Sequence, residues 1–160
     1  MKSMSIIEYR ALLQKKQQPP GSARKKARTG VDGTLLEEGE QRLLAEFLDA
    51  IGVPWFHVPN GGVRCAAEGG KLKAQGVKPG VPDNFIVAPP PNGPPDCPGT
   101  IIELKRKNGG VVSADQKRWL AFFETQGWTV KVCNGADEAI AFVERLGYTR
   151  DQKKVEKNHG

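Results

Sequence analysis

The sequence predicts an α/β fold in which a central mixed β-sheet is flanked by helices. The first observation is size, because 160 residues, 38% of them hydrophobic, suffice for one ordinary domain with one core. The second is patterning: three segments carry apolar residues at helical spacing, and four shorter segments have the composition of strands. The third is their order, α-β-β-β-α-β-α, which is typical of helices packed against a sheet.

The first helix is expected at 35–51. Thr34 and Glu37 have the spacing of a capping box at its start, and Gly52 follows its last turn. Its apolar face is expected to consist of Leu36, Leu43, Leu44, Phe47, Leu48 and Ile51.

Three strands are expected next, at 53–58, 83–88 and 100–107. The second strand begins directly after Pro82, which is tolerated there because a proline at a strand start removes no interior ladder bond. The proline-rich segment 89–99 is expected to be an exposed loop. The second and third strands can therefore pair as an antiparallel hairpin.

A strand–helix–strand unit with parallel strands is expected from residue 100 onward. Ser113 and Gln116 form a capping box for a helix that runs to about residue 126. This helix is expected to face inward with Trp119, Leu120, Phe122 and Phe123. A half-buried strand at 128–133 and a last helix at 136–146 complete the fold.

The positive charge is concentrated at the N-terminus. Residues 1–30 carry eight Lys or Arg and one acid, so they account for the whole net charge of +6, and the rest of the chain sums to −1. We expect a flexible basic arm at 1–33, a folded domain at 34–148 and a polar tail at 149–160. The run Arg24, Lys25, Lys26 and Arg28 is typical of an arm that follows phosphates. A solvated tail that only aids solubility is the alternative.

Several classes of protein are disfavoured. No run of about 18 apolar residues exists, and the N-terminus lacks the apolar stretch of a signal peptide, so we expect a cytoplasmic protein without a membrane span. Three scattered cysteines and two histidines argue against a disulfide framework and a structural zinc site.

An acid and a base lie side by side in the third expected strand. Side chains alternate across a strand, so Glu103 and Lys105 share one face, about 7 Å apart. The hairpin would bring Asp83, at the start of the preceding strand, close to Glu103. Two carboxylates there would suit Mg²⁺ or Mn²⁺, which bind hard oxygen ligands and phosphate oxygens. The alternative for Asp83 is turn chemistry.

Two further polar residues are candidates for the same site. Glu40 lies on the apolar stripe of the first helix, where a carboxylate is rare unless it has a partner or a metal; the alternative is a rim residue that reaches solvent. Gln116 heads the apolar stripe of its helix, and its part in the capping box is the structural alternative.

These residues together resemble a known family, the VRR-NUC (virus-type replication–repair nuclease) domain of the PD-(D/E)xK nuclease superfamily. The resemblance covers roughly residues 34–146. It rests on Gly80-Val81-Pro82-Asp83, Ile102-Glu103-Leu104-Lys105, Gln116 with Trp119-Leu120, Gly127 with the strand after it, Asn60-Gly61-Gly62, and the helix that carries Glu40.

The resemblance implies a restriction-endonuclease-like core and a Mg²⁺-dependent DNA endonuclease, with Mn²⁺ expected to substitute. It implies that Asp83, Glu103 and the backbone carbonyl of Leu104 bind the cation, with Glu40 as a possible further acid. Lys105 would orient water or stabilise phosphate charge, and Gln116 would support the site. Small stand-alone members of phage or bacterial type imply a homodimer acting on branched DNA, such as four-way (Holliday) junctions in DNA repair, in a bacterial or phage-infected cell.

Basic residues on both sides of the carboxylates are candidates for contacts with the DNA backbone. They are Lys71, Lys73 and Lys78 before Asp83, and Arg106 and Lys107 after Lys105. Plain solvated roles are the alternative for these residues.

Two alternatives to a structure-selective nuclease remain open. One is a nucleic-acid-binding module without catalysis, which the intact set of Asp83, Glu103 and Lys105 disfavours. The other is a sequence-specific restriction-type endonuclease, for which 160 residues leave little room for base-reading elements.

Overall fold

The computed structural model describes residues 37–59, 71–108 and 110–149. The predicted order α-β-β-β-α-β-α is confirmed. The elements are α2 (Glu37–Ile51), β1 (Trp55–His57), β2 (Asn84–Ile86), β3 (Thr100–Lys105), α4 (Ala114–Thr125), β4 (Thr129–Asn134) and α5 (Ala136–Arg145).

The four strands form one mixed sheet in the order β1-β2-β3-β4. β1 pairs with β2 and β2 with β3 in antiparallel fashion, whereas β3 and β4 run parallel. The predicted hairpin and the predicted parallel unit are therefore both present. β1 and β2 are shorter than expected, although the hydrogen bonds from Val58 N to Asp83 O and from Val87 N to Pro54 O extend the pairing by one step at each end.

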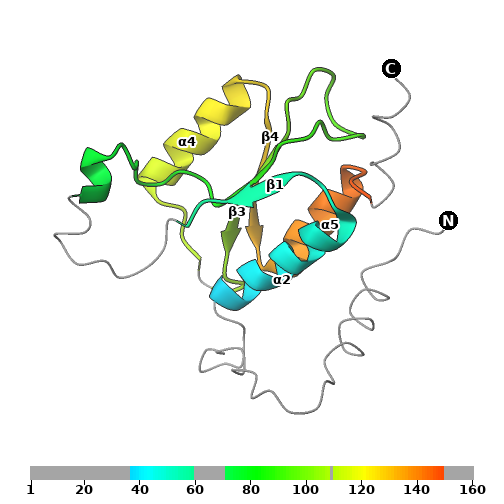
Figure 1. The fold of residues 1–160 in the computed structure, drawn as a ribbon, viewed down its shortest axis with the longest axis horizontal. Coiled ribbons are helices and arrows are strands. Elements are labelled where there is room, and N and C mark those ends of the chain that lie inside the picture. Colours follow the sequence, from blue (N-terminus) through cyan, green and yellow to red (C-terminus); the bar gives the residue numbers. More distant parts are fainter. Residues whose placement is uncertain (1–36, 60–70, 109, 150–160) are drawn as a thin grey trace, which may run out of the picture.

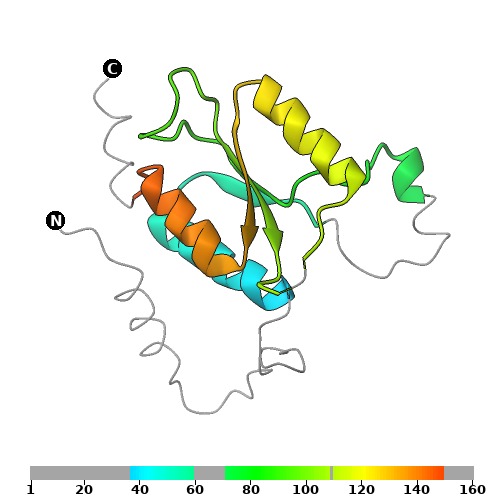
Figure 2. The same ribbon diagram turned by 180° about the vertical axis from the view of Figure 1, so that it is seen from behind.

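Helices cover both faces of the sheet. Figures 1 and 2 show α2 and α5 side by side on one face and α4 on the other. Alternation along β3 divides its side chains between these layers. Ile102 and Leu104 belong to the large core cluster under α2 and α5, and Ile101 belongs to a smaller cluster with Leu120 of α4.

The α4 layer differs from the prediction. Of the four residues expected to face inward, Leu120 is buried, Trp119 and Phe123 are half-buried, and Phe122 is 50% exposed. The four were assigned to one face because all are large and apolar, but Phe122 follows Leu120 by only two helical positions, which places it about half a turn away. It packs on the rings of Trp119 and Phe123 instead of on the sheet.

The segment 87–99 is largely exposed, as expected, yet it is fastened at two points. The Asn92 N–H donates to Leu146 O (2.9 Å), next to the end of α5. The Cys97 thiol is buried, and its Sγ lies 3.3 Å from Thr129 Oγ1 of β4. The long connection between β2 and β3 thus packs along the domain.

Several predictions fall on residues outside the described ranges. They are the basic arm with Arg24, Lys25, Lys26 and Arg28, the Asn60-Gly61-Gly62 turn, and most of the polar tail. Within the described residues, no helix is long and apolar enough to cross a membrane.

Candidate active site

The loop before β2 is seated directly on the first turn of α4. Gly80 has φ +74°, and a Cβ atom at this position would lie 2.6 Å from Asp115 Cβ and 2.7 Å from Gln116 N. The Trp119 indole N–H donates to Pro79 O (3.1 Å) and fastens the same contact. Only glycine allows this approach and this backbone conformation together. The contact brings Asp83, three residues later, to the helix that carries Gln116.

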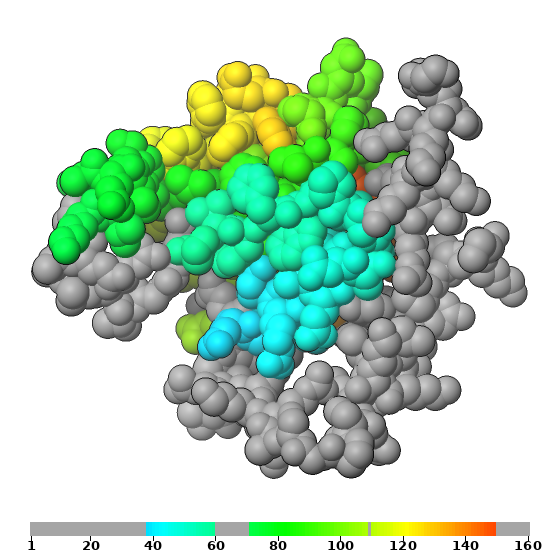
Figure 3. Space-filling model, in the orientation of Figure 1, coloured from blue at the N-terminus to red at the C-terminus, as the bar shows by residue number. Residues whose placement is uncertain are grey.

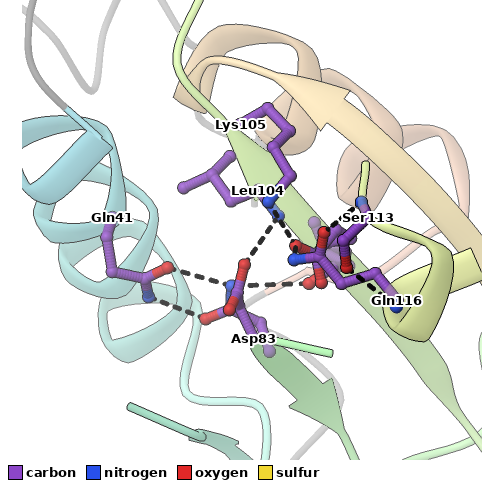
Figure 4. Close-up of polar contacts among 9 residues, drawn as sticks. Gln41, Asp83, Leu104, Lys105, Ser113 and Gln116 are labelled. Atoms are coloured by element: carbon purple, nitrogen blue, oxygen red, sulfur yellow. Dashed lines mark hydrogen bonds and ion pairs between the residues drawn. The ribbon is translucent and has the colours of Figure 1, made fainter. Parts of the chain in front are cut away.

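Asp83 directly precedes β2 and lies beside Leu104 of β3. The Leu104 N–H donates to Asp83 Oδ2 (3.3 Å), as Figure 4 shows. On the other side, Asp83 O accepts hydrogen bonds from Val58 N (2.7 Å) and His57 Nδ1 (2.8 Å). Both the backbone and the carboxylate of Asp83 are therefore held by neighbouring strands.

Glu103 is a fully buried carboxylate whose two oxygens have different surroundings. Oε1 accepts hydrogen bonds from Lys105 Nζ (2.5 Å) and from Gln116 Nε2. Oε2 is equally buried but has no hydrogen-bond partner within the described part of the chain. A buried carboxylate oxygen without a partner is costly unless a ligand satisfies it. The predicted pairing of Glu103 with Lys105 on one face of β3 is present.

Gln116 takes part both in the cap of α4 and in a hydrogen bond to Glu103. Its backbone N–H donates to Ser113 Oγ (3.2 Å), and its side-chain Oε1 accepts from Ser113 N (2.8 Å), which completes the capping box. With the amide oxygen fixed in this way, the NH₂ group points to Glu103, as Figure 4 shows for Gln116 and Ser113. The helix cap thus sets the orientation of the amide in the site.

Burial raises the pKa values of both carboxyl groups, and repulsion from Asp83 adds to the rise at Glu103. Burial, with the Asp83 charge adding to it and Lys105 opposing it, raises the pKa of Glu103 to about 7. Burial also raises the pKa of Asp83, against the lowering effects of Glu103, Lys105 and the Leu104 N–H. Two acids held this way resist full ionisation on their own, and a cation between them would relieve that cost.

The comparison with known families matches this part of the chain. The model of the VRR-NUC domain matches residues 63–137, which include Asp83, Glu103, Lys105 and Gln116. The matched family is a family of nuclease domains, and the match takes in just under half of the chain.

A solved structure described as a VRR_NUC domain protein shares the fold. It is 22% identical, with a TM-score of 0.58, and the alignment covers 70% of this chain and 88% of that chain. At this identity the likeness concerns the fold alone, an α/β architecture with a mixed sheet. No curated protein matches the chain.

Glu40, which precedes the matched residues, has its described partner on α5. It is buried, as its place on the apolar stripe predicted, and Glu40 Oε2 accepts a hydrogen bond from Ala136 N (2.8 Å). Gly135, the N-cap of α5, has no side chain to cap the helix. Glu40 supplies that cap from α2, and its predicted role as a metal ligand stays a prediction.

Three polar residues around Asp83 were not predicted for the site. His57 bonds the Asp83 carbonyl, and Asn84 forms a double amide hydrogen bond with Gln41 of α2 (2.7 and 3.0 Å), drawn in Figure 4. The sequence did contain one signal, because Asn84 is an amide in an otherwise apolar strand. Gln41 gave none, since a polar residue on a helix is ordinary.

The predicted DNA-contacting bases lie on two exposed segments. Lys71, Lys73 and Lys78 are exposed on the segment 71–78, which lies at one edge of the molecule in Figure 3 (green). Arg106 and Lys107 are exposed directly after Lys105. Lys107 also forms an ion pair with Asp137 (3.8 Å).

Proposed function

We propose that the protein is a divalent-metal-dependent DNA endonuclease that hydrolyses phosphodiester bonds and selects branched DNA, such as four-way junctions or flaps. The observation that carries the proposal is the asymmetry of Glu103. Lys105 and Gln116 both bond its Oε1, and its buried Oε2 has no partner among the described residues. A hard cation is the ligand that such an oxygen, close to a second carboxylate, would accept.

The residues present fit Mg²⁺ better than a transition metal. Within the described residues, no group of three or more His, Cys, Asp or Glu side chains could hold a metal ion. The proposed ligands are Asp83, Glu103 and the backbone carbonyl of Leu104, all of them hard oxygens. The Leu104 N–H points to Asp83, and in an extended strand the N–H and C=O of one residue face the same edge. Mg²⁺ typically takes few protein ligands and keeps several waters, and Mn²⁺ would substitute.

When bound, a divalent cation lowers the pKa of water and neutralises charge on a phosphate oxygen. The chain's own groups would act around it. Lys105 would place a compact positive charge where negative charge grows on the phosphate, its ammonium being held by Glu103 at 2.5 Å. Gln116 would keep Oε1 of Glu103 occupied, so that Oε2 stays available.

The proposed substrate class and assembly rest on the family resemblance. A homodimer would present two sites to a symmetric junction and permit paired nicks. The exposed Lys71, Lys73 and Lys78, with Arg106 and Lys107, would hold the DNA backbone. The basic arm with Arg24, Lys25, Lys26 and Arg28 would extend that contact.

The test is a cleavage assay on a synthetic four-way junction and on a linear duplex of the same sequences, with Mg²⁺ or with EDTA. We expect Mg²⁺-dependent nicking near the branch point and much weaker cutting of the linear duplex. Junction binding without nicking at any metal concentration would favour a binding module. Cutting of the linear duplex at one fixed sequence would favour a restriction-type enzyme.

A further inference from the structure

Asn84 is an amide at a position surrounded by apolar side chains. Its side chain is 0% exposed. It shares a face of β2 with Ile86, and its partner across β3 is Ile102, both of which belong to the core cluster under α2 and α5. A buried amide costs free energy unless its donors and acceptor are bonded.

The bonds that satisfy Asn84 come from one residue of α2 and one carbonyl of β3. Gln41 Nε2 donates to Asn84 Oδ1 (2.7 Å), and Asn84 Nδ2 donates back to Gln41 Oε1 (3.0 Å) and to Ile102 O (3.5 Å). The two amides thus form a closed reciprocal pair. Such a pair has one productive orientation for each amide, because the oxygen and the NH₂ group are not interchangeable.

The packing of α2 against the sheet does not require the Gln41–Asn84 pair. Replacing both partners of a buried hydrogen bond by apolar groups of similar shape is often neutral or stabilising. What the amides add is specificity of placement. Their hydrogen bonds form only when α2 lies in one position relative to the start of β2. The residue whose backbone position is fixed in this way is Asp83, the neighbour of Asn84.

Asp83 carries its carboxylate directly before the first residue of β2. The Val58 and His57 donors hold its carbonyl from β1, and Leu104 N bonds its carboxylate from β3. Through Asn84, the same peptide is also tied to α2 on the opposite face of the sheet. Asp83 is therefore the site residue whose position depends on three different elements.

We propose that Gln41 and Asn84 are positioning residues that fix the carboxylate of Asp83 for the divalent cation. The inference rests on the proposed function, because it assumes that Asp83 is a metal ligand. In this role the two amides would contact neither the cation nor the DNA. They act through the backbone, as groups behind metal ligands commonly do.

The test compares the double variant Gln41→Leu/Asn84→Leu with wild type by calorimetric titration of Mn²⁺ into the full chain without DNA. We expect the double variant to fold with a Tm near that of wild type but to bind Mn²⁺ roughly 10-fold more weakly. In the nuclease assay, kcat should fall and KM for DNA should stay unchanged. If the double variant does not fold, Gln41→Met, at a half-buried position, should give the same weakening.

Tyr148→Phe is the matched control. It removes buried hydrogen bonds to Thr100 (3.0 Å) and Ala88 O (2.6 Å) at the opposite end of β3. This variant should lose stability and keep wild-type Mn²⁺ affinity. A folded Gln41→Leu/Asn84→Leu chain with wild-type Mn²⁺ affinity would overturn the positioning role alone. Failure of the wild-type chain to bind Mn²⁺ would overturn the proposed metal site, and the positioning role with it.

Discussion

On the face of the sheet that α2 and α5 cover, Leu44, Ile102 and Val143 are completely excluded from solvent, whereas on the α4 face Phe122 is 50% exposed. The first face is a closed apolar core. The second has a small cluster around Phe85 and Leu120, and beside it lie Glu103 and Lys105. The comparison indicates a division between the two faces of the sheet. The large apolar cluster on one face supplies most of the stability, and the proposed catalytic side chains lie on the other. The buried Glu103–Lys105 pair lies on the α4 side, whereas the buried Glu40 carboxylate on the other side caps α5.

The largest effect is expected from Glu103→Gln on the α4 face. The change keeps the shape of the side chain but removes the negative charge from the oxygen that has no partner. We expect cleavage to fall by on the order of 10³-fold, as when a key electrostatic group is lost, with folding and junction binding retained. Single-turnover cleavage and a binding titration would measure this. Near-wild-type cleavage would remove Glu103 from the site.

The matching variant on the closed face is Leu44→Ala. Leu44 is 0% exposed in the large core cluster, so its truncation leaves a cavity. We expect a loss of about 3 kcal/mol in the free energy of unfolding, with the cleavage rate of the folded fraction unchanged. Urea unfolding and assays at low temperature would test this division. A stable Leu44→Ala chain with impaired cleavage would contradict the view that the α2 and α5 face contributes to stability and not to cleavage.

The carboxyl pair makes the pH dependence of stability unusual. Because the pKa of Glu103 is raised from 4.5 to about 7, the folded chain retains a proton that the unfolded chain loses between about pH 4.5 and 7. The free energy of unfolding of the metal-free protein should therefore fall as pH rises through this window, by on the order of 2 kcal/mol.

Urea unfolding in EDTA at several pH values, with Glu103→Gln as control, measures this contribution. The variant should lack the fall, and Mn²⁺ should stabilise wild type more at pH 8 than at pH 5 because binding displaces the proton. A wild-type curve parallel to that of Glu103→Gln would contradict the raised pKa.

The smallest effect concerns Glu40, which ties α2 to α5. Glu40→Ala leaves Ala136 N without its acceptor and should cost about 1 kcal/mol of stability, as for other helix caps. Glu40→Gln keeps an acceptor oxygen and should restore most of that loss. If Glu40 acts only as a cap, Glu40→Gln also cleaves at the wild-type rate. Loss of Mn²⁺ affinity in a stable Glu40→Gln chain would instead make Glu40 a metal ligand.

The parts of the site that could be predicted depend on short-range rules. Alternation along one strand places Glu103 beside Lys105, and a hairpin between adjacent strands brings Asp83 to both. The capping-box spacing located Gln116. Each of these relations is set by local geometry and by the order of elements, which the sequence displays.

The parts that could not be predicted depend on packing between distant segments. Gln41 and Asn84 are 43 residues apart, and Glu40 and Ala136 are 96 residues apart. Their pairing depends on how α2 is rotated on the sheet, and apolar periodicity does not determine this to within one residue. Phe122 shows the same limit, because an aromatic side chain on a partly covered helix can pack against its own neighbours.

Gly80 ties the shape of the loop that carries Asp83 to the docking of α4. The loop rests against α4 with less space than one methyl group requires, so any larger residue at position 80 would act as a wedge. It would lift the first turn of α4 and carry the amide of Gln116 away from the acids. The contact of Gly80 with the first turn of α4 therefore sets the distance between Asp83 and Gln116. A change in the loop would move the helix, and a change in the first turn of the helix would move the loop.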